Sequence, residues 1–288
     1  MKLNGGGSKK IVRPSQGVHL VVDSKFLGGD SALMIPKTKD GRVLFGVPWH
    51  GKVVLGTTDT PLDEDLLEPK ALEEEIDFIL DQAGQYLDKK PTREDVLSVF
   101  AGLRPLAAPD HTDSKKTKEI SRSHKIYKSS AGLLTITGGK WTTYREMAED
   151  AVNQVIKMAN LPDRPCVTKE LKQHGYMEDV NMDKWDYVYG SDIQYINRLI
   201  EEDSSNAQLL CEGFTFTKAH IIWAVRKEMA MTIEDVLARR VRLLFLDARA
   251  AIKVAPRVAS IMAAETGKDE QWVQQQVEEF NALANNYI

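Results

Sequence analysis

The sequence is poor in cysteine, with only Cys166 and Cys211 among its 288 residues. Two thiols exclude a disulfide framework and a cysteine-based zinc site, and they are typical of a reducing compartment. The sequence also has no His-Glu-x-x-His pattern, so we predict no metal site. It has no Gly-x-Ser-x-Gly turn, which leaves a serine hydrolase without support.

The chain has neither an excess of positive charge nor a long apolar run. Its 38 Lys and Arg residues are outnumbered by 42 Asp and Glu residues, for a formal net charge of −4. Binding to the phosphate backbone of nucleic acid is therefore disfavoured. No apolar stretch approaches the roughly 18 residues that a membrane-spanning helix needs, and no signal-peptide pattern is present.

Self-contained nucleotide-binding motifs are also lacking. No Gly-x-Gly-x-x-Gly follows a strand pattern, and no Gly-x-x-x-x-Gly-Lys-Ser/Thr loop occurs. The glycines of these motifs let the backbone approach phosphate groups closely. We therefore expect no complete nucleotide-binding βαβ unit within these 288 residues.

The character of the sequence changes once along the chain. Residues 1–10 contain a Gly-Gly-Gly-Ser run and indicate a flexible linker or a cloning scar. Residues 11–160 carry strand patterns and an amphipathic helix, whereas residues 167–288 are helical almost throughout. Proline-containing residues 161–166 separate them. We predict an α+β domain over 11–160, a linker over 161–166 and an all-α domain over 167–288.

Short motifs predict several individual elements. The apolar runs 43–49 and 52–56 are separated only by His50-Gly51, which predicts a hairpin. Thr232 and Asp235 have the spacing of a helix capping box. We further expect a hairpin over 125–137, a strand over 96–106, and helices within 68–90 and over 143–159, 193–201, 218–229, 232–245 and 269–283.

The segment from Gly138 to Arg145 predicts a strand that turns into a helix. Gly138 and Gly139 permit a tight turn, and Thr142 or Thr143 can cap the helix that follows. A helix start carries unpaired N–H groups and partial positive charge, so it can hold an anion or an electron-rich carbonyl. Lys140 adds a full positive charge. The alternative is a plain turn without a ligand.

Three further residues are candidates for binding or catalysis. Arg104 and Arg122 lie in strand or turn contexts, where a guanidinium can form a fork onto a carboxylate or phosphate. The alternative for each is an ordinary ion pair with an Asp. His19 begins a strand run, and an imidazole is a natural proton acceptor where it faces a pocket. A satisfied structural histidine is the alternative.

Five segments that include these candidates occur in one fixed order. They are Val12–Leu20, Pro48-Trp49 with Leu55–Asp59, Ala101–Leu106, Gly138–Arg145 and Glu234–Arg240. Together they resemble FAD-dependent glycerol-3-phosphate dehydrogenase of the aerobic bacterial type, over Ile11 to Ile288. The glycine-rich ADP-binding region at the N-terminus of that family has no counterpart here, so the chain resembles the C-terminal part.

The resemblance implies an α+β substrate or cap domain followed by an all-α domain, and a reaction. In it, sn-glycerol 3-phosphate is oxidised to dihydroxyacetone phosphate, with FAD as hydride acceptor and a quinone as final acceptor. His19 would act as base or orient the hydroxyl, and Arg104 and Arg122 would bind the phosphate. The residues that contact the flavin would be Gly138, Gly139, Lys140, Trp141 and Thr142. Lys140 would also be catalytic, and its position in the motif equally allows a contact with the substrate in place of the flavin.

The resemblance also implies a cytoplasmic enzyme that contacts the inner membrane peripherally and forms a homo-oligomer. We expect the present chain to retain no FAD by itself and to be inactive alone. Two alternatives stay open, a glycerol-3-phosphate oxidase that uses oxygen and a non-catalytic interaction module. Arg239, Arg240 and Arg242 indicate either a contact patch or, as we favour, a solvated face with internal salt bridges.

Overall fold

The computed structural model describes residues 12–62, 66–107, 123–182 and 184–288. It divides into two compact units. The first comprises Met1–Gly17, Thr58–Pro69 and Ala101–Lys172, and the second comprises Val18–Thr57, Lys70–Phe100 and Gln173–Ile288. Because strands β1 (Val12–Asp23) and β6 (Val96–Ala107) pass through this division, each contributes residues to both units. The domain boundaries predicted from composition stay a prediction.

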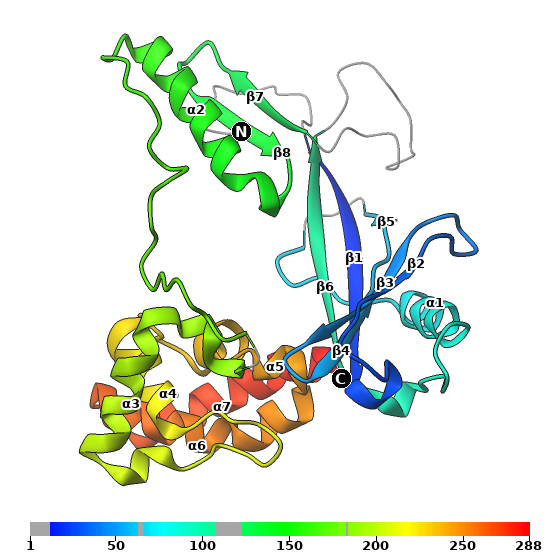
Figure 1. Cartoon of the computed structure of the whole chain (residues 1–288), viewed down its shortest axis with the longest axis vertical. Coiled ribbons are helices and arrows are strands. Elements are labelled where there is room, and N and C mark those ends of the chain that lie inside the picture. Colours follow the sequence, from blue (N-terminus) through cyan, green and yellow to red (C-terminus); the bar gives the residue numbers. More distant parts are fainter. Residues whose placement is uncertain (1–11, 63–65, 108–122, 183) are drawn as a thin grey trace. The chain divides into compact units, whose positions relative to one another are not determined.

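One six-stranded sheet has the order β2-β3-β4-β1-β5, and β6 also pairs with β1 (Figure 1). Strands β3 and β4 form the predicted hairpin, with positive φ angles of 47° at His50 and 74° at Gly51. The β1–β4, β1–β5, β2–β3 and β3–β4 pairs are antiparallel. The shorter strands are β2 (Leu33–Ile35), β3 (Leu44–Trp49), β4 (Lys52–Gly56) and β5 (Thr60–Pro61).

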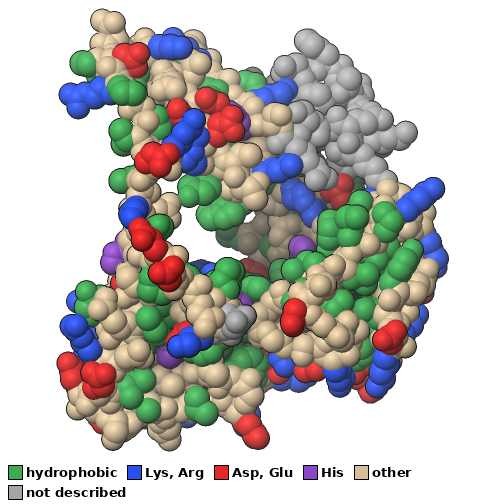
Figure 2. Space-filling model, viewed as in Figure 1, with side chains coloured by type: hydrophobic (Ala, Val, Ile, Leu, Met, Phe, Trp, Pro, Cys, Tyr) green, Lys and Arg blue, Asp and Glu red, His purple; other side chains and the backbone are tan. Residues whose placement is uncertain are grey.

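Alternation along strands β3 and β4 of the second unit gives this part of the sheet one buried face. Leu20 pairs with Leu55 across β1 and β4, and both are fully buried. Helix α1 (Glu73–Gly84) packs on β3 and β4 and buries Ile76 and Ile79. On the strands' other side, Phe45 is 43% exposed, and apolar side chains gather over β2 and β3 in Figure 2. The period of two thus separates a core face from an open one.

A second, two-stranded sheet belongs to the first unit. Strands β7 (His124–Lys128) and β8 (Leu134–Gly138) form the predicted hairpin, and helix α2 (Tyr144–Ala159) follows the glycine turn at the expected position. Helix α2 packs on β8. None of the residues of α2 is fully buried, so this helix covers its hairpin only loosely.

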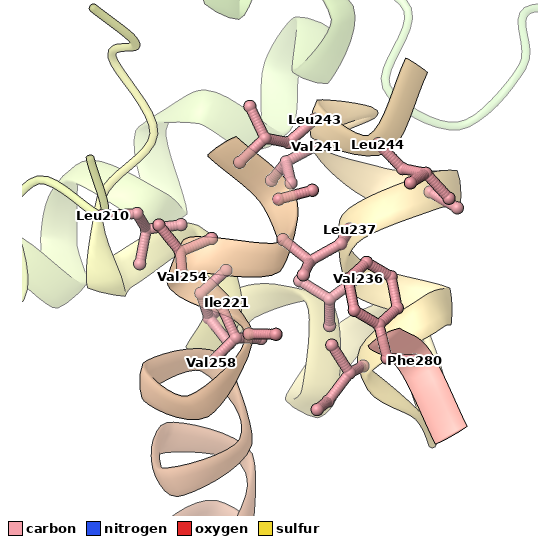
Figure 3. Packing of buried hydrophobic residues seen from close by; sticks show 14 of the residues in the cluster. Leu210, Ile221, Val236, Leu237, Val241, Leu243, Leu244, Val254, Val258 and Phe280 are labelled. Carbon is pink, nitrogen blue, oxygen red and sulfur yellow. The ribbon is translucent and has the colours of Figure 1, made fainter. Parts of the chain in front are cut away.

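The C-terminal part of the second unit is a helical bundle with a large apolar core and a separate, smaller cluster formed by Tyr189, Ile196, Ala219 and Trp223. Ile221, Leu237, Val258 and Phe280 come from four different segments and meet in the large core (Figure 3). Burial of such side chains contributes about 1.5–3 kcal/mol each. The helices are α3 (Ile193–Glu202), α4 (Lys218–Lys227), α5 (Leu243–Leu246), α6 (Ala248–Thr266) and α7 (Glu270–Ala284), with a π-helix over Asp235–Arg240.

The structure confirms the predicted fold class, an α+β part followed by a helical one, and corrects three details. Residues 167–182, which were expected to belong to the helical part, contain no helix. The helix expected over 232–245 is broken at Arg242, whose φ of 58° is left-handed. Helix α6 was not expected, although Asp247 caps its start. The capping box is confirmed, because Asp235 N donates to Thr232 Oγ1 and Thr232 N donates to Asp235 Oδ2. In the part that the structure describes, no helix combines the length and apolarity of a membrane span.

Candidate functional site

His19 lies on strand β1 in the second unit, and its ring is held from two sides. It is paired in register with Gly56 of β4, where an added Cβ would lie 2.4 Å from His19 Cδ2. The opposite contact is Phe100, whose ring stacks on the imidazole with centroids 5.3 Å apart and planes 18° apart. The glycine therefore makes room for the ring, and the phenylalanine fixes its plane. A proton acceptor needs such a fixed direction.

The helical bundle supports this arrangement from behind. Phe245 of α5 meets Phe100 edge to face, with centroids 5.1 Å apart and planes 78° apart. The ring of Phe245 in turn packs against that of Tyr287, with ring centroids 5.7 Å apart. Sequence reasoning identified none of these aromatic residues. The available signal for Phe100 was its place in the mostly apolar run 96–101 of β6, whereas the contact of Phe245 becomes visible only once the bundle is folded.

Arg104 lies on β6 within the first unit. Its Nη1 is 3.6 Å from Oδ1 of Asp59, and Asp59 also accepts a hydrogen bond from the hydroxyl of Ser15. The side chains of Arg104 and Asp59 are 32% and 14% exposed. The ion pair with an Asp that the sequence left open is therefore present, but its carboxylate is largely buried. Arg122, the second predicted phosphate ligand, lies outside the described residues.

The turn between β8 and α2 has the backbone that the two glycines predict. The φ angles are 74° at Gly138 and 78° at Gly139, in the region that favours glycine. An added Cβ at Gly139 would lie 2.5 Å from Met147 Sδ, and one at Gly138 would lie 2.9 Å from the carbonyl oxygen of Ser123. Backbone conformation and packing within the chain therefore require both glycines. The contact with a flavin stays a prediction.

The start of the following helix presents a cation and an aromatic ring to solvent. Thr143 is the N-cap residue of α2, but its hydroxyl makes no cap bond to that helix; its Oγ1 instead accepts from Lys140 N and donates to Lys140 O. Lys140 is exposed, and Trp141 is 87% exposed and stacks on Tyr144. Thr142 is also exposed. The predicted flavin-side residues are thus an accessible group rather than part of the core.

A pocket of about 360 Å³ lies beside this turn. It is lined by Ser123, His124, Lys140, Thr143 and Glu146. Nε2 of His124 lies 2.8 Å from a carboxylate oxygen of Asp150, which ties strand β7 to helix α2. Within the described ranges, no group of three or more His, Cys, Asp and Glu side chains could hold a metal ion.

The arginines near the C-terminus are mostly engaged within the bundle. Arg239 pairs with Glu234 at 2.5 Å and with Asp235 at 3.2 Å. Arg240 lies 4.0 Å from a carboxylate oxygen of Glu228. For Arg239 and Arg240 these contacts favour the solvated face with internal salt bridges.

Comparison with known families now defines the class of protein. The chain belongs to the FAD-dependent oxidoreductase family, whose model matches residues 2–145. The model of the C-terminal domain of alpha-glycerophosphate oxidase matches residues 133–273. The two models together cover the sheet, the glycine turn and most of the bundle. They confirm the family resemblance that the five ordered segments indicated.

Individual relatives agree with this family. Glycerol-3-phosphate dehydrogenase SDP6, mitochondrial, from Arabidopsis thaliana is 37% identical over 302 residues, covering 94% of this chain and 47% of that protein. The mitochondrial enzyme of Homo sapiens is 34% identical over 301 residues, covering 96% and 41%. The chain therefore spans about half the length of the curated relatives it matches.

Among solved structures, glycerol-3-phosphate dehydrogenase from Bacillus halodurans complexed with FAD is similar with a TM-score of 0.77. The two are 27% identical, and the match covers 96% of this chain and 57% of that one. The similarity extends through both the strand-rich part and the helical bundle.

Proposed function

We propose that this chain is the substrate-recognition part of an FAD-dependent enzyme that oxidises sn-glycerol 3-phosphate to dihydroxyacetone phosphate. The observation that carries the proposal is the fixed imidazole of His19, clamped between Gly56 and Phe100, in a chain of this family. The names of the relatives support the choice of substrate.

Oxidation of a secondary alcohol removes a proton from the hydroxyl and a hydride from the carbon. His19 is the proposed acceptor of the proton, or the group that orients the hydroxyl. Phe100 stacks on the imidazole with ring centroids 5.3 Å apart, and this contact fixes the plane of the ring. FAD, when bound, supplies the hydride acceptor.

The phosphate end of the substrate requires fixed cations. Arg104 offers a guanidinium group. The side chain of Arg104 is 32% exposed, so part of it is accessible to a ligand. A planar guanidinium matches two phosphate oxygens at once, which a lysine cannot do. Arg122 is the second proposed phosphate ligand.

The glycine turn has a donor set that fits the anionic edge of a reduced flavin. Lys140 provides an exposed positive charge at the start of the 3₁₀ turn Trp141–Thr143, which leads into the sixteen-residue helix α2. The partial positive charge of a helix start adds to that of the side chain. Gly138, Gly139, Lys140, Trp141 and Thr142 are the residues proposed to hold the cofactor, and Lys140 keeps its alternative role toward the substrate.

The remaining parts of the proposal concern the whole enzyme. We propose a quinone as final acceptor, a cytoplasmic location with peripheral membrane contact, and a homo-oligomer. We further propose that these 288 residues do not retain FAD alone and are inactive by themselves, because the sequence contains no Gly-x-Gly-x-x-Gly unit. Oxygen as acceptor is the second candidate, favoured by the match to the domain of alpha-glycerophosphate oxidase.

Ligand binding by the purified chain tests the proposed substrate. In isothermal titration calorimetry, we expect sn-glycerol 3-phosphate to bind more tightly than glycerol, and Arg104→Gln to remove that preference. Arg198→Gln is the matched control, because Arg198 is an exposed arginine of helix α3. Equal affinity for the two ligands, or a preference that survives Arg104→Gln, contradicts the proposal.

The absorbance spectrum tests the proposed loss of the cofactor. A flavoprotein absorbs light at about 450 nm, and we expect the purified chain to show no absorbance band there. One flavin per chain would refute this part. In flavin-loaded enzyme, oxygen consumption with and without a quinone analogue separates the two acceptors, since only an oxidase consumes oxygen at full rate without the quinone.

A further inference from the structure

We propose that Asp59 is a positioning residue that, together with Ser15 and Gly17, fixes the guanidinium of Arg104 for the phosphate of the substrate. The proposal rests on the proposed function, because it gives Asp59 a role only if Arg104 binds phosphate.

The four residues come from three segments of the first unit. Ser15 and Gly17 lie on β1, Asp59 immediately precedes β5, and Arg104 lies on β6. Antiparallel pairing of Ser15 with Pro61 brings the Asp59 segment alongside β1. Ser15 is fully buried and donates its hydroxyl hydrogen bond to Oδ1 of Asp59.

The same carboxylate oxygen holds the arginine. Oδ1 of Asp59 lies 3.6 Å from Nη1 of Arg104, and that nitrogen is buried. The carboxylate therefore interacts with the inner edge of the guanidinium, while 32% of the arginine side chain remains exposed. A hydrogen bond from a buried hydroxyl restricts the rotation of the carboxylate. Ser15 thus orients the carboxylate of Asp59, and the carboxylate in turn orients the guanidinium of Arg104.

Gly17 supplies an independent constraint. An added Cβ there would lie 2.3 Å from Nη2 of Arg104 and 2.6 Å from both Nη1 and Cζ. The φ angle of Gly17 is outside the left-handed region, so the backbone does not require glycine at this position. The guanidinium instead occupies the space that any side chain would fill. Asp59 therefore contacts the guanidinium, and Gly17 leaves the space into which the guanidinium fits.

Fixing the guanidinium improves binding because an ordered side chain loses less conformational freedom when the ligand arrives. Immobilising one flexible side chain weakens binding by a factor of roughly 2 to 12. In the folded chain, that ordering is already provided by Asp59 and Gly17. The expected consequence is tighter binding of phosphate groups without an additional contact to the ligand.

A competing explanation gives Asp59 the opposite effect. A carboxylate 3.6 Å from a guanidinium offsets its positive charge and could only weaken the attraction for an anion. Replacement by Asn would then tighten phosphate binding. Positioning predicts weaker binding instead. The sign of the change in Asp59→Asn therefore separates the two explanations.

The experiment is calorimetric titration of the 288-residue chain with sn-glycerol 3-phosphate and, separately, with inorganic phosphate. Gly17→Ala displaces the guanidinium without changing a charge, and we expect it to raise both Kd values about tenfold. We expect Asp59→Asn to raise both about fivefold. Gly29→Ala is the matched control, because its Cβ would meet nothing within 4 Å and its φ is ordinary; its Kd values should stay within about twofold of wild type.

The outcomes distinguish a failure of the positioning role from a failure of the proposed function. Unchanged Kd values in Gly17→Ala and Asp59→Asn, or tighter binding in Asp59→Asn, overturn the positioning role alone. Weaker binding of sn-glycerol 3-phosphate with unchanged inorganic phosphate also overturns it, since the effect would then lie at the glycerol end. A wild-type chain that binds neither ligand overturns the proposed function and this role with it. Thermal unfolding of each variant is recorded, and Asp59→Asn decides if Gly17→Ala does not fold.

Discussion

His220 in helix α4 makes the stability of the helical bundle depend on pH. The ring is 4% exposed and lies among aromatic rings, with the centroid of Trp185 at 4.9 Å and that of Tyr189 at 5.3 Å. Its Nδ1 accepts a hydrogen bond from the backbone N–H of Thr217 at 3.1 Å. Burial disfavours the imidazolium and lowers the pKa of His220 from 6.5 to about 4.

The direction of the effect follows from proton binding. Between pH 6.5 and 4 the unfolded chain holds a proton on His220 that the folded chain excludes, so acid favours unfolding. The bundle has its full stability above the unfolded pKa and loses it as pH falls toward the folded pKa. The linkage relation gives a loss of about 1 kcal/mol from pH 7 to about 5.5, and about 3 kcal/mol by pH ~4.

The assay compares the wild-type chain with His220→Asn. An asparagine amide oxygen can still accept from Thr217, but it does not titrate, so the variant should be less stable at neutral pH and lose less stability in acid. Urea unfolding at pH values of about 7, 5.5 and 4 gives the two slopes. Tryptophan fluorescence follows the transition, and Trp185, one of the five tryptophans of the chain, lies against the ring of His220. Parallel pH profiles in the two proteins would refute the reasoning.

Three substitutions test the packing of the second unit by urea unfolding. Ser98→Ala removes a fully buried hydroxyl that donates to the carbonyl of Leu244 at 2.9 Å, and we expect a loss of about 1–3 kcal/mol. Leu237→Ala empties a fully buried core position and should cost about 2–5 kcal/mol. Asp269→Ala removes the cap that accepts from Trp272 N and should cost about 1 kcal/mol. Losses within about 0.5 kcal/mol of zero, the range of neutral surface changes, would contradict each assignment.

Local patterns predicted the elements whose order is set within a few residues. The hairpin at His50-Gly51, the turn at Gly138 and the capping box at Thr232 all depend on contacts between near neighbours. Helix α6 escaped prediction although both of its ends carry signals, an Asp247 cap and a left-handed Gly267. Pro256 in its interior removes one backbone donor, and packing in the apolar core maintains the helix across it.

The candidate site was predictable only in its residue types. The sequence indicated His19 and Arg104 as candidates, because an imidazole can accept a proton and a guanidinium can bind a phosphate. The residues that orient them are distant in sequence and meet only through strand pairing. Gly56 reaches His19 across β1 and β4, and Asp59 reaches Arg104 from the segment before β5. The hydrophobic periodicity within a single segment does not indicate contacts between distant segments.

The edge-to-face contact between Phe100 and Phe245 affects whether the helical domain can be exchanged between members of this family. An all-helical domain behind an oxidoreductase sheet resembles a detachable module that could be exchanged between relatives. Here the ring of Phe245 lies 5.1 Å from the ring that backs the imidazole of His19. A chimera that kept both folds but placed a smaller side chain at position 245 would carry an intact bundle and a loosened histidine. The helical domain therefore supports the candidate site, and exchanging it would change the packing around the proposed proton acceptor.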